Sequence, residues 1–328
     1  MTVLKIAIVF FVVIVGFFYV KASNFTPFIP PSQPASTVEG SSAVTGVMTQ
    51  PLWQFATGMT PSVYGVPGIL SGAALVFFAF IGFDVVATAS EETKNPHKNV
   101  PLGIGVGMLL IIVMYMLVAV VTTGMVSYAD LAKQDSPSLA TAFELVGADW
   151  AAKIISFGIV LGLATVVMVL LLGLTRIVFA MSRDGLLPRG LSKDPAKHGT
   201  PALCRSSSAA VVALVAAFFD IGVLSDMVNI GTLSAFTLVA ISIPIMRKKR
   251  PDLPRAFKMP GDPWIPILIA VANFWLMLNL SVLTWIRFVV WLVVGVAIYF
   301  GYGYWHARLG KGDLTETLSA ETDKAVNG

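Results

Sequence analysis

One apolar stretch of the chain, residues 66–89, contains a glycine and an ionisable residue near its middle, Gly82 and Asp84. A carboxylate inside an apolar helix is costly to bury, which makes Asp84 a functional candidate. Glycine lets a helix unwind locally, and the carbonyl groups released by such a break can bind a cation or an ammonium group. The alternative interpretation is structural: Gly82 is a packing contact, and Asp84 caps a half-helix or pairs with a neighbouring side chain.

Lys5, in the first apolar stretch of the chain, is the second candidate. One interpretation is an anchor, whose ammonium group reaches the membrane surface while its methylene stem stays in the apolar layer. The other interpretation is a buried lysine that exchanges its proton, because burial disfavours the charged form of a lysine. Position alone favours the anchor.

Residues suited to other chemistry are scattered along the chain. His97, His198 and His306 lie far apart in polar segments, and Cys204 is the single cysteine, so the sequence predicts neither a metal centre nor an intrachain disulfide. No catalytic set of side chains converges within the apolar stretches, so we expect no enzyme activity and no cofactor. The glycines of residues 103–107 open an apolar helix with no strand before it, and we interpret them as helix contacts rather than a nucleotide loop.

The composition of the whole chain is typical of a membrane protein. Of its 328 residues, 56% are hydrophobic and only 12% are charged, and the mean hydropathy is +0.82. A helix needs about 20 apolar residues to cross the hydrocarbon layer, and the apolar runs do not alternate as barrel strands do. The sequence therefore predicts an all-α integral membrane protein with eight transmembrane helices. The helices are expected at residues 3–21, 66–89, 101–127, 151–182, 207–224, 227–246, 264–284 and 285–306.

The basic residues indicate an orientation in the membrane. Of the 22 Lys and Arg residues, 17 lie near the end of the second, fourth, sixth and eighth apolar runs or in the segments that follow them. Because Lys and Arg accumulate on the cytoplasmic side, we expect a multi-pass protein of the inner (plasma) membrane with both termini in the cytoplasm. The net charge of +4 is then a topology signal, and no nucleic-acid partner is expected.

The polar segments have a simpler interpretation. Residues 22–68 are rich in Pro, Ser, Thr and Gly and predict a mobile external loop with one interfacial turn at residues 52–55. Residues 311–328 predict a polar, disordered cytoplasmic tail. A signal peptide is the alternative for residues 1–23, but the apolar run is long for one and Lys21 interrupts the small-residue cleavage pattern.

Several long motifs resemble the amino-acid permeases of the amino acid–polyamine–organocation superfamily, in its cationic amino-acid transporter-like branch. Residues 77–92, FFAFIGFDVVATASEE, resemble the sixth helix of that branch. Residues 173–188, GLTRIVFAMSRDGLLP, resemble its eighth helix, and residues 229–236, NIGTLSAF, resemble its tenth. Residues 284–288 and 298–303 resemble its last two helices. The motifs follow the family order, and the resemblance covers about residues 1–308.

The resemblance implies a fold of two five-helix inverted repeats plus two further helices. The eight predicted runs would be the fifth to twelfth helices, so the first four family helices are expected to be absent from this N-terminally truncated chain. The missing first helix carries the break that binds the substrate carboxylate. Residues 1–310 would form a partial permease domain with a long external loop at residues 22–65, and the missing helices would be a separate partner chain if the protein is split. An in-frame extension upstream that encodes four more helices would decide this point.

The resemblance also implies a substrate site on the run 66–89. The broken sixth helix of the family offers carbonyl groups to the substrate ammonium, and those positions match Ala79, Phe80 and Ile81, next to Gly82. The aromatic residue that closes over the substrate matches Phe83.

Three further residues complete the expected site. The lysine that replaces sodium in proton-coupled family members matches Lys5, and this match favours the proton-exchange interpretation. Asp84 remains a candidate because of its depth in the helix. Thr165 lies at a depth at which it can face the site, although no motif supports this residue.

The resulting hypothesis is secondary active transport of amino acids by alternating access, as a symport with protons. The expected partners are the amino-acid substrate and the lipid bilayer. The alternative is a non-transporting fragment or an accessory membrane subunit, because the first substrate-binding helix is expected to be absent. The substrate side chain is not predicted, since much of its pocket would come from the absent helices.

Overall fold

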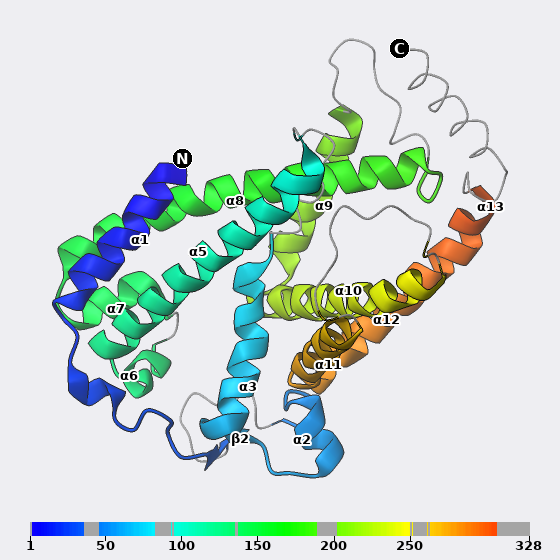
Figure 1. Ribbon diagram of the computed structural model, residues 1–328. Helices are drawn as coiled ribbons and strands as arrows, with labels where there is room; N and C mark the ends of the chain where they lie inside the picture. Colours follow the sequence, from blue (N-terminus) through cyan, green and yellow to red (C-terminus); the bar gives the residue numbers. More distant parts are fainter. Residues whose placement is uncertain are drawn as a thin grey trace. The chain divides into compact units, whose positions relative to one another are not determined.

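The computed structural model is built almost entirely from helices (Figure 1). Among the described residues the only sheet is an antiparallel pair of short strands, β1 (Gln33–Pro34) and β2 (Ser62–Val63). A helix satisfies its own backbone hydrogen bonds, as lipid requires, so the arrangement agrees with the predicted all-α membrane class. The structure describes residues 2–35, 46–82, 93, 95–134, 137–188, 202–249, 251, 261 and 263–306.

Four of the described helices are long and apolar enough to cross a membrane. Their apolar side chains point mostly outward: Leu109, for example, is 66% exposed. A surface of this kind is unstable in water and is matched by lipid. The four are α5 (Pro96–Met125), α8 (Asp149–Arg183), α10 (Ile221–Lys249) and the continuous run of α12 (Val282–Ile298), η7 (Tyr299–Gly303) and α13 (Tyr304–His306).

Shorter apolar helices lie in the other four predicted runs. With 10–17 residues each, they fall below the length of about 20 residues that a perpendicular span needs. The count of eight spans therefore stays a prediction. These helices are α1 (Thr2–Phe17), α3 (Gly65–Val76) with its extension η4 (Phe77–Phe80), α9 (Ala202–Phe218) and α11 (Trp264–Leu278).

Two predicted helix boundaries are wrong. The sequence placed one connection at residues 225–226 and another at residue 284, whereas α9 ends at Phe218 and α11 ends at Leu278. The next helices begin directly after Asp220 and Ser281. Short polar side chains favour the position before a helix, and they set these boundaries although the flanking residues are apolar.

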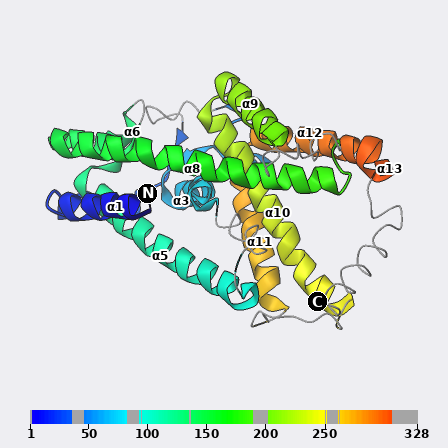
Figure 2. The same cartoon turned by 90° about the horizontal axis from the view of Figure 1, so that it is seen from above.

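The chain divides into two compact units, residues 1–167 with 225–285, and residues 168–224 with 286–328. The first unit has a hydrophobic core where α1, α5, α7 (Leu139–Leu145) and the first part of α8 meet. Val12, Phe143 and Ile155 are fully buried in this core. Both views show α1 alongside α5 and the beginning of α8 (Figures 1 and 2).

Small residues allow these helices to approach closely. A Cβ atom added to Gly16 of α1 would collide with Val121 and lie 2.8 Å from the sulfur of Met125. A Cβ added to Gly158 of α8 would collide with Ile8 of α1. Close backbone approach of this kind lets apolar helices pack tightly when lipid gives no hydrophobic driving force between them.

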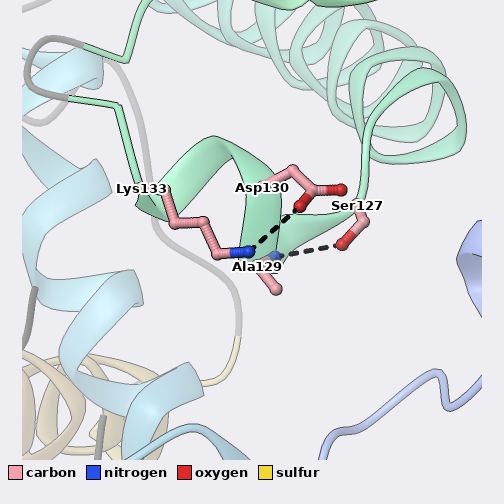
Figure 3. A network of polar contacts seen from close by, with 4 residues as sticks. All are labelled: Ser127, Ala129, Asp130 and Lys133. Atoms are coloured by element: carbon pink, nitrogen blue, oxygen red, sulfur yellow. Dashed lines mark hydrogen bonds and ion pairs between the residues drawn. The ribbon is translucent and has the colours of Figure 1, made fainter. Parts of the chain in front are cut away.

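The connection between α5 and α7 contains the short helix α6 (Tyr128–Ala132). The hydroxyl of Ser127 accepts a hydrogen bond from the backbone N–H of Ala129 at 3.2 Å, and this cap begins the helix (Figure 3). Lys133 Nζ lies 3.5 Å from Asp130 Oδ1, with both side chains more than half exposed. An exposed pair of this kind adds about 0–1 kcal/mol, so the cap and the chain's apolar contacts position this connection.

The described part of residues 22–68 contains short helices and hydrogen bonds to α5. The backbone N–H of Lys21 and the side-chain amide of Asn24 both donate to the carbonyl of Gly124, at 2.9 and 2.8 Å. The expected irregular loop is therefore held against the end of α5 here, and the predicted turn is a helix. The helical elements in this segment are η1 (Ala22–Phe25) and α2 (Leu52–Thr57).

The close contact at Gly16 gives a prediction for stability. Gly16→Ala should lower the free energy of unfolding by about 1–3 kcal/mol, because the added methyl group overpacks the core. Gly162→Ala is the matched control, since a Cβ at Gly162 meets no atom of the described residues within 4 Å. The control should gain about 0.5–1 kcal/mol from the helix preference of alanine. Thermal unfolding of both variants in the same detergent is the measurement, and equal melting temperatures would contradict the packing argument.

Candidate functional site

The helix that begins with α3 changes its geometry at residues 77–82. The α-helical part ends at Val76, and residues 77–80 form a tighter 3-10 turn. Ile81 is extended, with φ −63° and ψ 136°, and Gly82 has φ +117°, a conformation that favours glycine. The sequence therefore permits a break in the helix at this point, inside an apolar stretch. We call residues 77–82 the break.

The break offers backbone groups and no side-chain charge. Residues 65–82 contain no Asp, Glu, Lys or Arg. The carbonyl groups at the end of a helix carry a partial negative charge of about half an electron. Since the end of α3 and η4 lies in an apolar segment, that partial charge is the local electrostatic feature that can attract a cation or an ammonium group.

One carbonyl group of the break is held by α5. The hydroxyl of Tyr115 donates to the carbonyl oxygen of Ala79 at 2.8 Å, and its ring meets Phe80 edge-on with centroids 5.2 Å apart. Within the break, the N–H of Ile81 donates to the carbonyl of Phe78 at 3.2 Å. A carbonyl oxygen has two lone pairs, so the oxygen of Ala79 can accept from Tyr115 and from a second donor.

The α3 side of the break is held by α10. Asn229 is fully buried, and its Nδ2 donates to the carbonyl of Leu75 at 3.4 Å, at the long end of the hydrogen-bond range. The Oδ1 atom of Asn229 is buried without a hydrogen-bond partner among the described residues. Further along α10, Phe236 meets Phe77 edge-on with centroids 6.1 Å apart. The break is therefore bounded by α5 and α10, each through one polar and one aromatic contact.

Four of the predicted site residues lie in the break. They are the consecutive residues Ala79, Phe80, Ile81 and Gly82. Phe83 and Asp84 lie outside the described residues.

Lys5 and Thr165 lie on other helices. Lys5 is half-buried on α1, and no hydrogen bond or ion pair joins it to the break within the part of the chain that the structure describes. The hydroxyl of Thr165 donates to the carbonyl of Gly162 at 2.7 Å, within α8 itself. Their roles in a substrate site stay predictions.

Sequence reasoning missed Tyr115 and Asn229. Each had a signal, because a lone tyrosine in the run 101–127 and an asparagine inside an apolar helix both need a hydrogen-bond partner. The sequence could not name the partner, since each bond joins residues far apart in the chain.

Comparison with known proteins identifies the family of the chain. A sequence model of the family described as amino acid permease matches residues 1–303. The branched-chain amino acid permease BcaP of Bacillus subtilis (strain 168) is 41% identical over 311 residues, which cover 95% of this chain and 60% of that protein. The methylthioribose transporter of the same organism is 39% identical over 308 residues, covering 94% of this chain and 59% of that protein.

A third relative is the cationic amino acid transporter 3, mitochondrial, of Arabidopsis thaliana, which is 44% identical over 195 residues, 60% of this chain and 31% of that protein. The chain spans about 60% of the length of the first two relatives. The match of the family model over most of the chain shows that it belongs to the amino acid permease family, a family of transporters and not of enzymes.

Proposed function

We propose that this chain carries part of the translocation pathway of an amino-acid transporter that works by secondary active transport. The observation that carries the proposal is the uncharged break at residues 77–82, where helix-end carbonyl groups lie in an apolar segment. An ammonium group is the part of an amino acid that such carbonyl groups bind. The break is part of the region that the permease family model matches, which supports an amino acid as the substrate.

The names of the relatives set the range of substrates to test. They include a branched-chain amino acid permease, cationic amino acid transporters and a methylthioribose transporter. Branched-chain and cationic amino acids share an α-ammonium group, the group that helix-end carbonyls bind, whereas the name of the methylthioribose transporter refers to a sugar derivative. We therefore propose an α-amino acid and assign the ammonium to the carbonyl groups of Ala79, Phe80 and Ile81. Phe83 is proposed to close over the substrate, and Asp84 and Thr165 to face it.

We also propose that the transport is a symport with protons and that Lys5 is the titrating group. Lys5 is half-buried in an apolar helix and has no carboxylate partner among the described residues. An unpaired ammonium in an apolar layer is costly, which makes Lys5 a functional candidate. The proposed setting is the cytoplasmic membrane, with eight spans, alternating access and both termini in the cytoplasm.

The first test uses the glycine of the break. Gly82→Ala should lower amino-acid uptake about tenfold or more, because alanine at φ +117° is strained by about 1–3 kcal/mol and the break must change shape. Uptake of radiolabelled isoleucine and arginine by the full-length gene product in proteoliposomes is the measurement, with methylthioribose as a competitor.

Gly72→Ala is the control for that test, since Gly72 lies within α3 and a Cβ there meets nothing within 4 Å in the part of the chain that the structure describes. The control should insert and transport like the unmodified protein. Equal uptake by the two variants would contradict a role for the break. If the unmodified protein takes up neither isoleucine nor arginine, the proposed function is refuted.

A second test removes the hydrogen bond to Ala79. Tyr115→Phe keeps the ring contact with Phe80 and loses only the hydroxyl, so the net loss is about 0.5–1.5 kcal/mol, or roughly 2- to 10-fold in kcat/KM for uptake. Tyr128→Phe is the control, because Tyr128 is similarly exposed and lies outside the break. A Tyr115→Phe variant with unchanged uptake kinetics would remove Tyr115 from the site.

The third test concerns the coupling ion. Lys5→Met keeps the length of the side chain and removes the titrating group, so accumulation driven by an imposed pH gradient should be lost. Lys21→Met, at the exposed end of the same segment, should accumulate substrate normally. Uptake is measured with a pH gradient, with and without sodium. Sodium-dependent uptake, or full accumulation by Lys5→Met, would return Lys5 to the role of a membrane anchor.

A further inference from the structure

Residues 46–52, just before and at the start of α2, pair with the turn between α11 and α12. Pro51 and Ser281 form an antiparallel bridge. The N–H of Leu52 donates to the carbonyl of Leu280 at 3.0 Å, and the N–H of Val282 donates to the carbonyl of Gln50 at 3.1 Å. We call residues 46–52 the clasp. The pairing joins two segments that lie far apart in the sequence.

The clasp caps the first turn of α12. The first N–H groups of a helix have no partner within the helix and need one from outside. The clasp supplies two partners, since the N–H of Val282 donates to Gln50 and the N–H of Leu283 donates to the carbonyl of Met48 at 2.8 Å. The third N–H, that of Thr284, donates to the side-chain oxygen of Ser281 at 3.2 Å. The beginning of α12 therefore depends on the clasp.

Thr284 connects the start of α12 to α10 through a side-chain hydrogen bond. Thr284 is fully buried, and its hydroxyl donates to the carboxylate of Asp226 at 3.1 Å. Since that hydroxyl proton is used, the 2.7 Å contact between the hydroxyls of Ser281 and Thr284 must be donated by Ser281. The carboxylate also lies beside the positive end of the α12 dipole, which strengthens a charge-assisted bond of this kind.

From Asp226 the connection continues along α10 to the break. Asn229 follows one helical turn later and donates to the carbonyl of Leu75, at the end of α3. Phe236 on the same helix contacts Phe77, the first residue of the break. The clasp, the start of α12, α10 and the break thus form one continuous chain of contacts within the first compact unit.

α2 and the α11–α12 turn, which are joined by the clasp, each contain a buried amide side chain with unsatisfied polar atoms among the described residues. Gln54 is 1% exposed and Asn279 is 4% exposed. Both amide atoms of Gln54 and the Oδ1 of Asn279 are buried without a partner among the residues that the structure describes. Buried polar atoms without partners weaken an interface, so this contact can separate at lower cost than an apolar core.

We propose that Thr284 is a positioning residue that couples the clasp to the break. When the clasp is paired, Thr284 holds Asp226, and α10 holds the end of α3 through Asn229. When the clasp separates, α12 loses the partners of its first N–H groups, the bond to Asp226 weakens, and α10 is free to release the break. The clasp thereby acts as a strap that sets the flexibility of the break through α12 and α10.

Amide hydrogen exchange of the unmodified protein and of two Thr284 variants in detergent tests the coupling without any need for transport. Thr284→Val keeps the shape of the side chain and removes the hydroxyl. Exchange should become at least about tenfold faster both in peptides covering residues 46–57 and in peptides covering residues 70–82. Thr284→Ser keeps the hydroxyl and should restore the slow exchange. Faster exchange confined to the first turn of α12, or no change in Thr284→Val, would overturn the proposal.

A second variant tests the direction of the coupling. Asn229→Leu has a similar volume and cuts the link between α10 and α3, so it should accelerate exchange at residues 70–82 and leave residues 46–57 unchanged. Adding Thr284→Val to Asn229→Leu should then accelerate residues 46–57 but give no further change at residues 70–82, because both substitutions act through the same link. Independent, additive effects at residues 70–82 would refute the path through α10.

The functional meaning of the coupling rests on the proposed transport. Thr284→Val should change the turnover rate of uptake by about tenfold with little change in KM, and Thr284→Ser should restore it. Coupled exchange with unchanged uptake by Thr284→Val would refute a role of the clasp in transport. If the unmodified protein transports no amino acid, the proposed function fails, while the exchange measurements still decide the coupling.

Discussion

The interior of a membrane offers no water to bond with the backbone, and this constraint explains both the regular and the irregular parts of this chain. An N–H or carbonyl group without a partner in hydrocarbon costs several kcal/mol, so apolar stretches are expected to remain helical. The break at residues 77–82 departs from the α-helix, and its neighbours compensate for it. Tyr115 supplies a donor to Ala79, and Asn229 supplies one to Leu75.

The same constraint explains why the helices of the first unit meet through small residues and a few polar bonds. Their outer faces are apolar and match lipid, so burial of apolar surface contributes little to their association. Close approach at Gly16 and Gly158 supplies dispersion contacts, and polar contacts such as that of Thr284 with Asp226 supply specificity. A packed core around Phe143 and polar links around α10 thus coexist in one unit, and the polar links are the ones that can rearrange.

The sequence predicted the helical class and the four long apolar helices because apolar length is a local property of the chain. It misplaced the boundaries near Asp220 and Ser281, since apolar residues on both sides hide a short turn from a hydropathy argument. It did not predict the hydrogen bonds of Lys21 and Gln50, because each pairs with a residue that lies far away in the chain. For the same reason the glycine of the break could be recognised in the sequence, whereas the hydrogen bonds that Tyr115 and Asn229 donate to Ala79 and Leu75 could not.

The way in which the break is held bears on how it could work. Tyr115 uses one of the two lone pairs of the Ala79 carbonyl, so an ammonium group can bind beside the hydroxyl without displacing it. Asn229, by contrast, bonds Leu75 at 3.4 Å, and its buried oxygen has no hydrogen-bond partner among the described residues, so its hold on α3 is weak. A tight support on the α5 side and a loose support on the α10 side favour movement of α10 relative to the break. Within this unit, α10 is also the helix to which the clasp is linked through Thr284, so the long bond of Asn229 and the pairing of the clasp lie on the same helix-to-helix connection.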